Sequence, residues 1–165
     1  MSILLFHRPI QSGKTTELKN FLPLMRKVGG FICPDLEGLR HFYAIEEKKL
    51  YSFQVAEEIP GKTLRIGRFH FLLSTFKKAK KLMKQAMLQH YDYVVIDEVG
   101  KLEIERNEGL EPVLSQLIAH YQQESSEGNL ILVVRDYLVN AVTEHYQLRT
   151  PVLIDELNQW NFKNR

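Results

Sequence analysis

Gly13, Lys14 and Thr15 have the residue types and the order that bind phosphate groups together with a divalent cation. A lysine ammonium reaches phosphate oxygens, a threonine hydroxyl ligates Mg²⁺, and backbone N–H groups at a helix N-terminus point at the phosphates. An apolar run at residues 3–6 precedes this segment and a helical pattern follows it. The pattern predicts a phosphate-binding loop (P-loop, or Walker A) whose nucleotide contacts would come from Arg8, Pro9, Ile10, Gln11, Ser12, Gly13, Lys14, Thr15 and Thr16.

The first half of this loop departs from the G-x-x-x-x-G-K-[ST] pattern. Arg8 occupies the first glycine position, and Gln11 and Ser12 stand where many such loops have more glycine. If position 8 needs a positive φ, an L-residue there costs about 1–2 kcal/mol relative to glycine. Taken alone, the segment could therefore be an unrelated turn, and Arg8 is itself a candidate for phosphate contact.

A second Gly-Lys-Thr sequence, at residues 61–63, tests this interpretation. Residues 64–71 after it alternate like a strand and offer no helix N-terminus. After Thr15, by contrast, apolar residues fall at helical spacing up to Val28, Gly29-Gly30 close the segment, and Pro23 predicts a kink or break. We assign the phosphate loop to the first copy and interpret the second as a coincidental turn.

Two acids, Asp97 and Glu98, directly follow the apolar run at residues 93–96. A buried strand ending in an acid has the form of a Walker B motif, in which Asp97 would hold Mg²⁺ together with Thr15. A carboxylate beside the γ-phosphate, here Glu98, can orient and deprotonate water, which typically contributes about 10²–10⁴-fold to a rate. The alternative is a polar strand terminus that caps the next turn.

Arg135 follows another buried run, residues 130–134. In P-loop proteins with a glutamate after the Walker B aspartate, the next strand lies between the two Walker strands. The side chain at its carboxyl end would face the phosphates, so Arg135 is a candidate for stabilising charge on the γ-phosphoryl group during catalysis. The alternative is a surface arginine paired with Asp136 or Glu144.

Composition limits the class of protein. The 165 residues are 44% hydrophobic, which suits one domain spanning residues 1–165, and the net charge of +2 does not by itself call for nucleic acid or a membrane. The single cysteine, Cys33, forms no internal disulfide, and no Cys/His group has zinc-ligand spacing. The sequence shows neither a signal peptide nor the ~20 apolar residues of a membrane span. We expect a cytoplasmic protein without a membrane partner.

Strands alternate with helices after the loop, which predicts an α/β fold: a doubly wound, mainly parallel sheet of the P-loop NTPase type with helices on both faces. Strands are expected at residues 2–6, 31–33, 93–96, 130–134 and 152–154. Helices are expected after Thr15, from an N-cap at Ser74, from near Pro112, and from a cap at Asp136. Residues 38–72 read as a small β-hairpin insertion, with runs at 41–46 and 50–55 and a third strand at 66–72.

The helix expected over residues 74–90 is rich in lysine. Its apolar residues form one stripe and its lysines occupy the other faces, namely Lys77, Lys78, Lys80, Lys81 and Lys84. Because no aromatic residues are interleaved with the lysines, a solvated helix face is the preferred interpretation and a nucleic-acid partner is unlikely. The sequence does not identify a protein partner; if the protein is a non-catalytic assembly component, this helix and the β insertion would contact one.

The segment Asp97-Glu98-Val99-Gly100-Lys101-Leu102-Glu103-Ile104 resembles the D-E-I-G-K-M-E-L signature of the THEP1-type nucleoside-triphosphatases. The resemblance extends to Gly13-Lys14-Thr15-Thr16, Gly30-Phe31 and Gly67-Arg68-Phe69. It implies Mg²⁺-dependent hydrolysis of several nucleoside triphosphates to diphosphate and phosphate, on a RecA-like core with weak base discrimination.

Carried over by position, the resemblance implies that Lys14 and Thr15 hold phosphate and Mg²⁺, that Asp97 serves the metal and that Glu98 activates water. Lys101 and Glu103 match the signature without an assignable chemical step. Two alternatives stay open: a small-molecule kinase on the same fold, and a non-hydrolysing nucleotide switch whose loop has diverged at Arg8. We find no signal for a nucleophilic Ser or Cys hydrolase.

Overall fold

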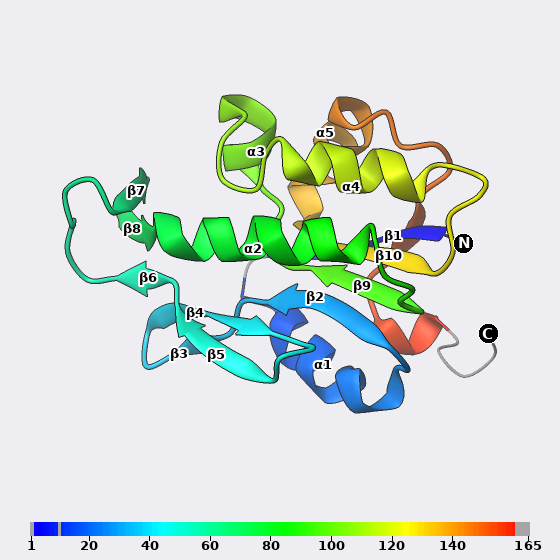
Figure 1. Ribbon diagram of the computed structural model, residues 1–165, viewed down its shortest axis with the longest axis horizontal. Helices are drawn as coiled ribbons and strands as arrows, with labels where there is room; N and C mark the ends of the chain where they lie inside the picture. The colour runs from blue at the N-terminus through cyan, green and yellow to red at the C-terminus, as the bar shows by residue number, and fades with distance from the viewer. Residues whose placement is uncertain (1, 10, 161–165) are drawn as a thin grey trace.

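A computed structural model describes residues 2–9 and 11–160, with a mainly parallel sheet at its centre (Figure 1). The strands follow the order β11-β1-β10-β9-β2-β4-β3, and β5 pairs with β4 beside this path. The pairs from β11 to β2 are parallel, and β4 joins β2 in the antiparallel sense. The parallel strands are β1 (Ser2–Arg8), β2 (Val28–Ile32), β9 (Tyr93–Ile96), β10 (Asn129–Arg135) and β11 (Val152–Ile154).

Helices cover both faces of this sheet (Figure 1). Since successive strand residues point to opposite faces, Ile3 and Leu5 join one buried cluster and Leu4 and Phe6 the other. The first cluster includes buried residues of α2 (Leu73–Ala86), α4 (Val113–Tyr121) and α5 (Val139–His145). The second includes those of α1 (Lys14–Phe21) and of the 3₁₀ helix η3 (Leu157–Gln159). The doubly wound fold predicted from the alternating pattern is thus confirmed.

The β-rich segment between the first two helices contains hairpins, as predicted. One hairpin, β4 (Leu39–Ala44) with β5 (Lys49–Ser52), extends the central sheet, and the short β3 (Asp35–Leu36) pairs back onto β4. The rest forms a small sheet of its own, β6-β8-β7, from Gln54–Val55, Phe69–Leu72 and Thr63–Ile66. The single strand expected at residues 66–72 is wrong, because a turn at Gly67, with φ of 60°, divides it into β7 and β8.

The expected first helix is too long. Pro23 breaks it as predicted, since α1 ends at Phe21 and the 3₁₀ helix η1 (Leu22–Leu24) follows. Val28 and Gly29-Gly30, read as the helix end, instead begin β2. Gly30 has a φ of 91°, and a Cβ at this position would lie 2.0 Å from the Val95 carbonyl oxygen. The glycine is therefore required by close strand packing, not by a helix terminus.

The helix expected from near Pro112 is confirmed, since α4 begins at Val113. Two other helix starts differ from expectation. Ser74 lies inside the first turn of α2, whose N-cap is Leu72. Asp136 opens a 3₁₀ helix, η2 (Asp136–Leu138), before α5, and its carboxylate accepts the Tyr137 N–H (2.9 Å) instead of capping α5. The helix α3 (Lys101–Arg106) was not predicted, because six residues are too few for a clear helical period. Among the helices described, none has the length and apolarity to cross a membrane.

Candidate functional site

Three neighbouring parallel strands bring the predicted site residues together. The strand β10 lies between β1 and β9, as predicted for this class of P-loop protein. Arg8 at the end of β1 pairs in register with Arg135 at the end of β10, and Asp97 follows directly on β9. Since parallel strands end at the same edge of a sheet, the predicted phosphate loop, Asp97 and Arg135 lie together at one edge, which is the candidate site.

The loop after β1 places its left-handed residues elsewhere than at position 8. Gln11 has a φ of 58° and Gly13 a φ of 81°, whereas Arg8 is still part of the strand. The backbone strain considered for an arginine in the first glycine position therefore does not arise. The helix α1 begins at Lys14, and its N-cap is Gly13. Pro9 in the loop and Thr16 in α1 are exposed, and Ile10 lies outside the described residues.

Lys14 folds back onto its own loop. Its ammonium donates hydrogen bonds to the carbonyl oxygens of Arg8 (3.0 Å) and Pro9 (2.8 Å). Burial lowers the pKa of Lys14, and the positive charges of Arg135 and Arg8 act in the same direction, while Asp97 opposes them. A cation that is partly desolvated and held by neutral carbonyls is well prepared to bind an anion. In the described part of the loop, the Ser12 hydroxyl is also buried without a hydrogen-bond partner.

Thr15 and Asp97 meet across the site, although they are far apart in the sequence. The Thr15 hydroxyl donates a hydrogen bond of 2.9 Å to Oδ2 of Asp97, which is 2% exposed. The same carboxylate accepts the backbone N–H groups of Cys33 and Glu98, each at 2.9 Å. Burial raises the pKa of Asp97, and the hydrogen bonds from Cys33 and Thr15 and the charges of Arg40 and Lys14 counteract this effect.

This donor set fits Mg²⁺. The cation prefers oxygen ligands and, beside phosphates, takes few from the protein and the rest from phosphate oxygens and water. One hydroxyl and one carboxylate lie together here, and the described residues contain no group of three or more His, Cys, Asp or Glu side chains that could hold a metal by itself. Thr15 and Asp97 can therefore serve Mg²⁺ only together with a bound phosphate chain and water.

Glu98 is the exposed member of the acid pair. It has a φ of 68°, an uncommon value for a residue other than glycine, so its side chain leaves the strand direction while Asp97 stays buried. Its carboxylate forms an ion pair with the guanidinium of Arg40 on β4. No sequence signal pointed to Arg40, which lies within a hairpin pattern.

The side chain of Arg8 contacts protein groups on two other segments. Its guanidinium pairs with Glu17 of α1 and donates to the carbonyl oxygen of Asp155, just after β11. Glu17 in turn accepts the N–H of Leu157 at 2.7 Å. Arg8 and Glu17 thus connect the phosphate loop to the C-terminal segment.

Arg135 is exposed at the carboxyl end of β10, as predicted. It donates a hydrogen bond to the Tyr137 hydroxyl (3.2 Å), and it forms no ion pair with Asp136 or Glu144 among the described residues. The positive charge of Arg135 contributes to lowering the pKa of Lys14. The position is compatible with either a phosphate contact or a surface role.

Glu103 has a structural place that explains its part in the signature. Its carboxylate, 2% exposed, accepts the backbone N–H groups of Gly100 (3.1 Å) and Leu110 (3.2 Å) and so ties both ends of the α3 segment together. Burial raises the pKa of Glu103 to about 7. Glu103 therefore shapes the connection that follows the two acids.

Glu103→Gln is expected to flatten the pH dependence of stability. Since the folded-state pKa of about 7 lies above the ordinary value of 4.5, the contribution of Glu103 is full below pH 4.5 and is lost as pH rises through 7. The difference between native and variant should change by up to about 3 kcal/mol over this window. Urea unfolding at pH 5, 6, 7 and 8 measures it, with the exposed Glu105→Gln as control. Parallel pH profiles for Glu103→Gln and the native protein would contradict the assignment.

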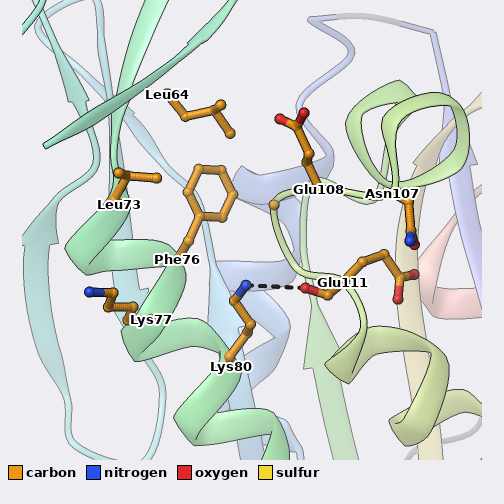
Figure 2. A pocket seen from close by; sticks show the side chains of 9 residues that line it. Leu64, Leu73, Phe76, Lys77, Lys80, Asn107, Glu108 and Glu111 are labelled. Atoms are coloured by element: carbon orange, nitrogen blue, oxygen red, sulfur yellow. Dashed lines mark hydrogen bonds between the residues drawn. The ribbon is translucent and has the colours of Figure 1, made fainter. Parts of the chain in front are cut away.

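A separate pocket of about 330 Å³ lies between the start of α2 and the α3–α4 connection (Figure 2). Phe76, Leu73 and Leu64 form its apolar side, and Lys80 crosses it to donate a hydrogen bond of 3.1 Å to the Glu111 carbonyl oxygen. None of the predicted phosphate, metal or catalytic residues lines this pocket. The candidate site is therefore the open end of the strands and not this pocket.

The chain is similar to known proteins over nearly its whole length. The profile of a family described as NTPase matches residues 6–161. Nucleoside-triphosphatase THEP1 from Thermotoga sp. (strain RQ2) is 26% identical over 168 residues, which cover 98% of this chain and 88% of that protein. The THEP1 of Thermotoga maritima is also 26% identical, over 167 residues with the same coverage.

Solved structures show the same fold. The crystal structure of THEP1 from Aquifex aeolicus has a TM-score of 0.68 at 19% identity, covering 93% of this chain and 88% of that one. The solution structure of a human cancer-related nucleoside triphosphatase has a TM-score of 0.63 at 17% identity, covering 94% and 88%. With the family match over nearly all of its length, the chain belongs to the THEP1-type nucleoside-triphosphatase family.

Proposed function

We propose that this protein is a Mg²⁺-dependent nucleoside-triphosphatase that hydrolyses ATP, GTP and other nucleoside triphosphates to diphosphate and phosphate. The contact of 2.9 Å between Thr15 and Asp97 carries the proposal, because it joins the two Walker motifs at one point. Names of relatives at 26% identity agree with this class of activity.

Each residue has a defined task in the proposed reaction. Lys14 and the backbone N–H groups of the loop bind the β- and γ-phosphates, and Thr15 and Asp97 hold the metal. When bound, Mg²⁺ supplies charge neutralisation to the β- and γ-phosphate oxygens. Arg135 adds positive charge on the same side of the sheet.

Glu98 accepts a proton from a water molecule placed in line with the γ-phosphorus. The water oxygen forms a bond to that phosphorus, and the bond from the γ-phosphorus to the bridging oxygen breaks, leaving a nucleoside diphosphate and phosphate. Glu98 suits this task because its carboxylate is exposed beside the buried Asp97. A kinase would use an alcohol in place of water.

Removal of the metal or of its threonine ligand is expected to stop the reaction. Phosphate release should occur from ATP, GTP, CTP and UTP with Mg²⁺ and be lost with EDTA. Thr15→Val, which keeps the shape but removes the hydroxyl, should lower the rate about 100-fold, while Thr15→Ser retains most activity. Release that persists in EDTA would refute the metal dependence. Turnover that appears only when an alcohol acceptor is added would favour the kinase alternative.

A further inference from the structure

Arg40 is a charged residue at the site that neither the P-loop nor the Walker B motif contains. Its guanidinium pairs with the carboxylate of Glu98, and the two side chains are 29% and 37% exposed. The positive charge of Arg40 also counteracts the rise in pKa that burial causes at Asp97, as does the charge of Lys14. Arg40 therefore lies on the side of the two acids that solvent, and hence a nucleotide, can reach.

The hairpin arrangement holds Arg40 in this place. The strand β4, which carries Arg40, pairs with β2, and β2 pairs with β9, whose end bears Asp97 and Glu98. On its other side Arg40 is in register with Asp35 of β3, and its N–H group donates to Oε1 of Gln54 at 3.3 Å. The β-hairpin insertion thus places Arg40 at the carboxyl edge of the parallel sheet.

The groups that would serve a nucleotide have internal partners in this structure. Lys14 is bound by the carbonyls of Arg8 and Pro9, Thr15 by Asp97, and Glu98 by Arg40. A triphosphate offers stronger hydrogen-bond acceptors to the two cations, Lys14 and Arg40, than their present partners do. Guanidinium binds phosphate in a bidentate, charge-assisted manner, and a terminal phosphate carries more charge than the single carboxylate of Glu98.

We propose that Arg40 recognises the γ-phosphate of a nucleoside triphosphate, exchanging its ion pair with Glu98 for that phosphate. The inference rests on the proposed binding of nucleoside triphosphates at this site. A triphosphate then frees the Glu98 carboxylate to face water, whereas a diphosphate, which lacks the γ-phosphate, leaves the Arg40–Glu98 ion pair intact. Arg40 is thereby the residue that discriminates substrate from product.

Nucleotide affinity without turnover tests this role. The dissociation constants of a non-hydrolysable ATP analogue and of ADP, both with Mg²⁺, are measured by calorimetry for the native protein and for Arg40→Gln and Arg40→Lys. Arg40→Gln should weaken binding of the analogue about tenfold or more and change that of ADP less than about twofold. Arg40→Lys keeps the positive charge but lacks the paired N–H donors of the guanidinium, so its affinity for the analogue should lie between those of Arg40→Gln and the native protein.

Arg149→Gln is the matched control, because Arg149 is exposed and precedes β11, at the opposite end of the sheet from the site. It should bind both nucleotides like the native protein. In the native protein, the Nε–H NMR signal of Arg40, identified by its loss in Arg40→Lys, should shift with the analogue and not with ADP. This signal decides the question even if Arg40→Gln fails to fold.

Equal loss of affinity for both nucleotides, no loss for either, or tighter binding of the analogue would overturn the role of Arg40. Because these measurements need no hydrolysis, they separate the two proposals. If the protein hydrolyses nucleotides but Arg40→Gln leaves the preference for the triphosphate analogue over ADP unchanged, only the role of Arg40 is refuted. If the protein binds neither nucleotide, the proposed function is refuted as well.

Discussion

Glu98→Gln is expected to lower the turnover number for ATP by about 10²–10⁴-fold while nucleotide binding is retained. The amide has nearly the shape of the carboxylate but does not accept a proton from water. Glu98 is exposed, and within residues 2–9 and 11–160 its side chain pairs only with Arg40, so the substitution should not disturb the buried sheet. Phosphate release and the affinity for a non-hydrolysable analogue, measured on the same preparation, give the two numbers.

Glu127→Gln is a suitable control for this prediction. Glu127 is exposed and precedes β10, so it lies at the amino end of the sheet, away from the site. Its turnover should match that of the native protein. Full activity of Glu98→Gln would exclude Glu98 as the base, and parallel losses of turnover and affinity would make it a binding residue instead.

Lys14→Ala is expected to weaken binding of both triphosphate and diphosphate by about 100-fold or more, because the ammonium reaches oxygens that both nucleotides possess. The fold should survive the change. Burial already lowers the pKa of Lys14, which means that the folded protein disfavours its charge, so removal of the charge relieves a cost at neutral pH. Nucleotide titration and a thermal melt measure the two effects.

Lys62→Ala tests which Gly-Lys-Thr sequence forms the phosphate loop. Lys62 is exposed in a turn that leads into the strand β7 and not into a helix, although its carbonyl oxygen accepts the N–H of Leu73, the first residue of α2, at 2.9 Å. Its replacement should leave nucleotide affinity unchanged. Should Lys62→Ala, and not Lys14→Ala, abolish binding, the assignment of the first copy would be refuted.

The two acids and the central strands could be found from the sequence because their signals are local. A run of β-branched residues ending in Asp97-Glu98 indicates a buried strand and its polar end without knowledge of its neighbours. The alternation that joins Ile3 with one core and Leu4 with the other follows from strand geometry alone. The break at Pro23 is equally local, since proline lacks the N–H group that a helix interior needs.

The sequence patterns were misleading where the local conformation depends on contacts with residues that are distant in the sequence. Val28 continues a helical spacing in the sequence and Gly29-Gly30 were read as the helix end. The space beside Val95, however, admits only a glycine at position 30, and the segment becomes β2. Arg8 would strain the loop if position 8 needed a positive φ, but the strand β1 continues through Arg8, and the left-handed conformations fall at Gln11 and Gly13. Such outcomes depend on contacts across the sheet that no local pattern contains.

By itself, the sequence determined the acid pair at the end of a buried strand and the alternating α/β order, and it predicted the phosphate loop, because these signals need only residue type and short-range spacing. Only the tertiary structure placed Thr15 against Asp97, Arg8 beside Asp155 and Arg40 against Glu98. Each of these contacts depends on which strands become neighbours and in what register. That choice is made by the free energy of packing the whole sheet between its two helical layers, so it cannot be read from any single segment.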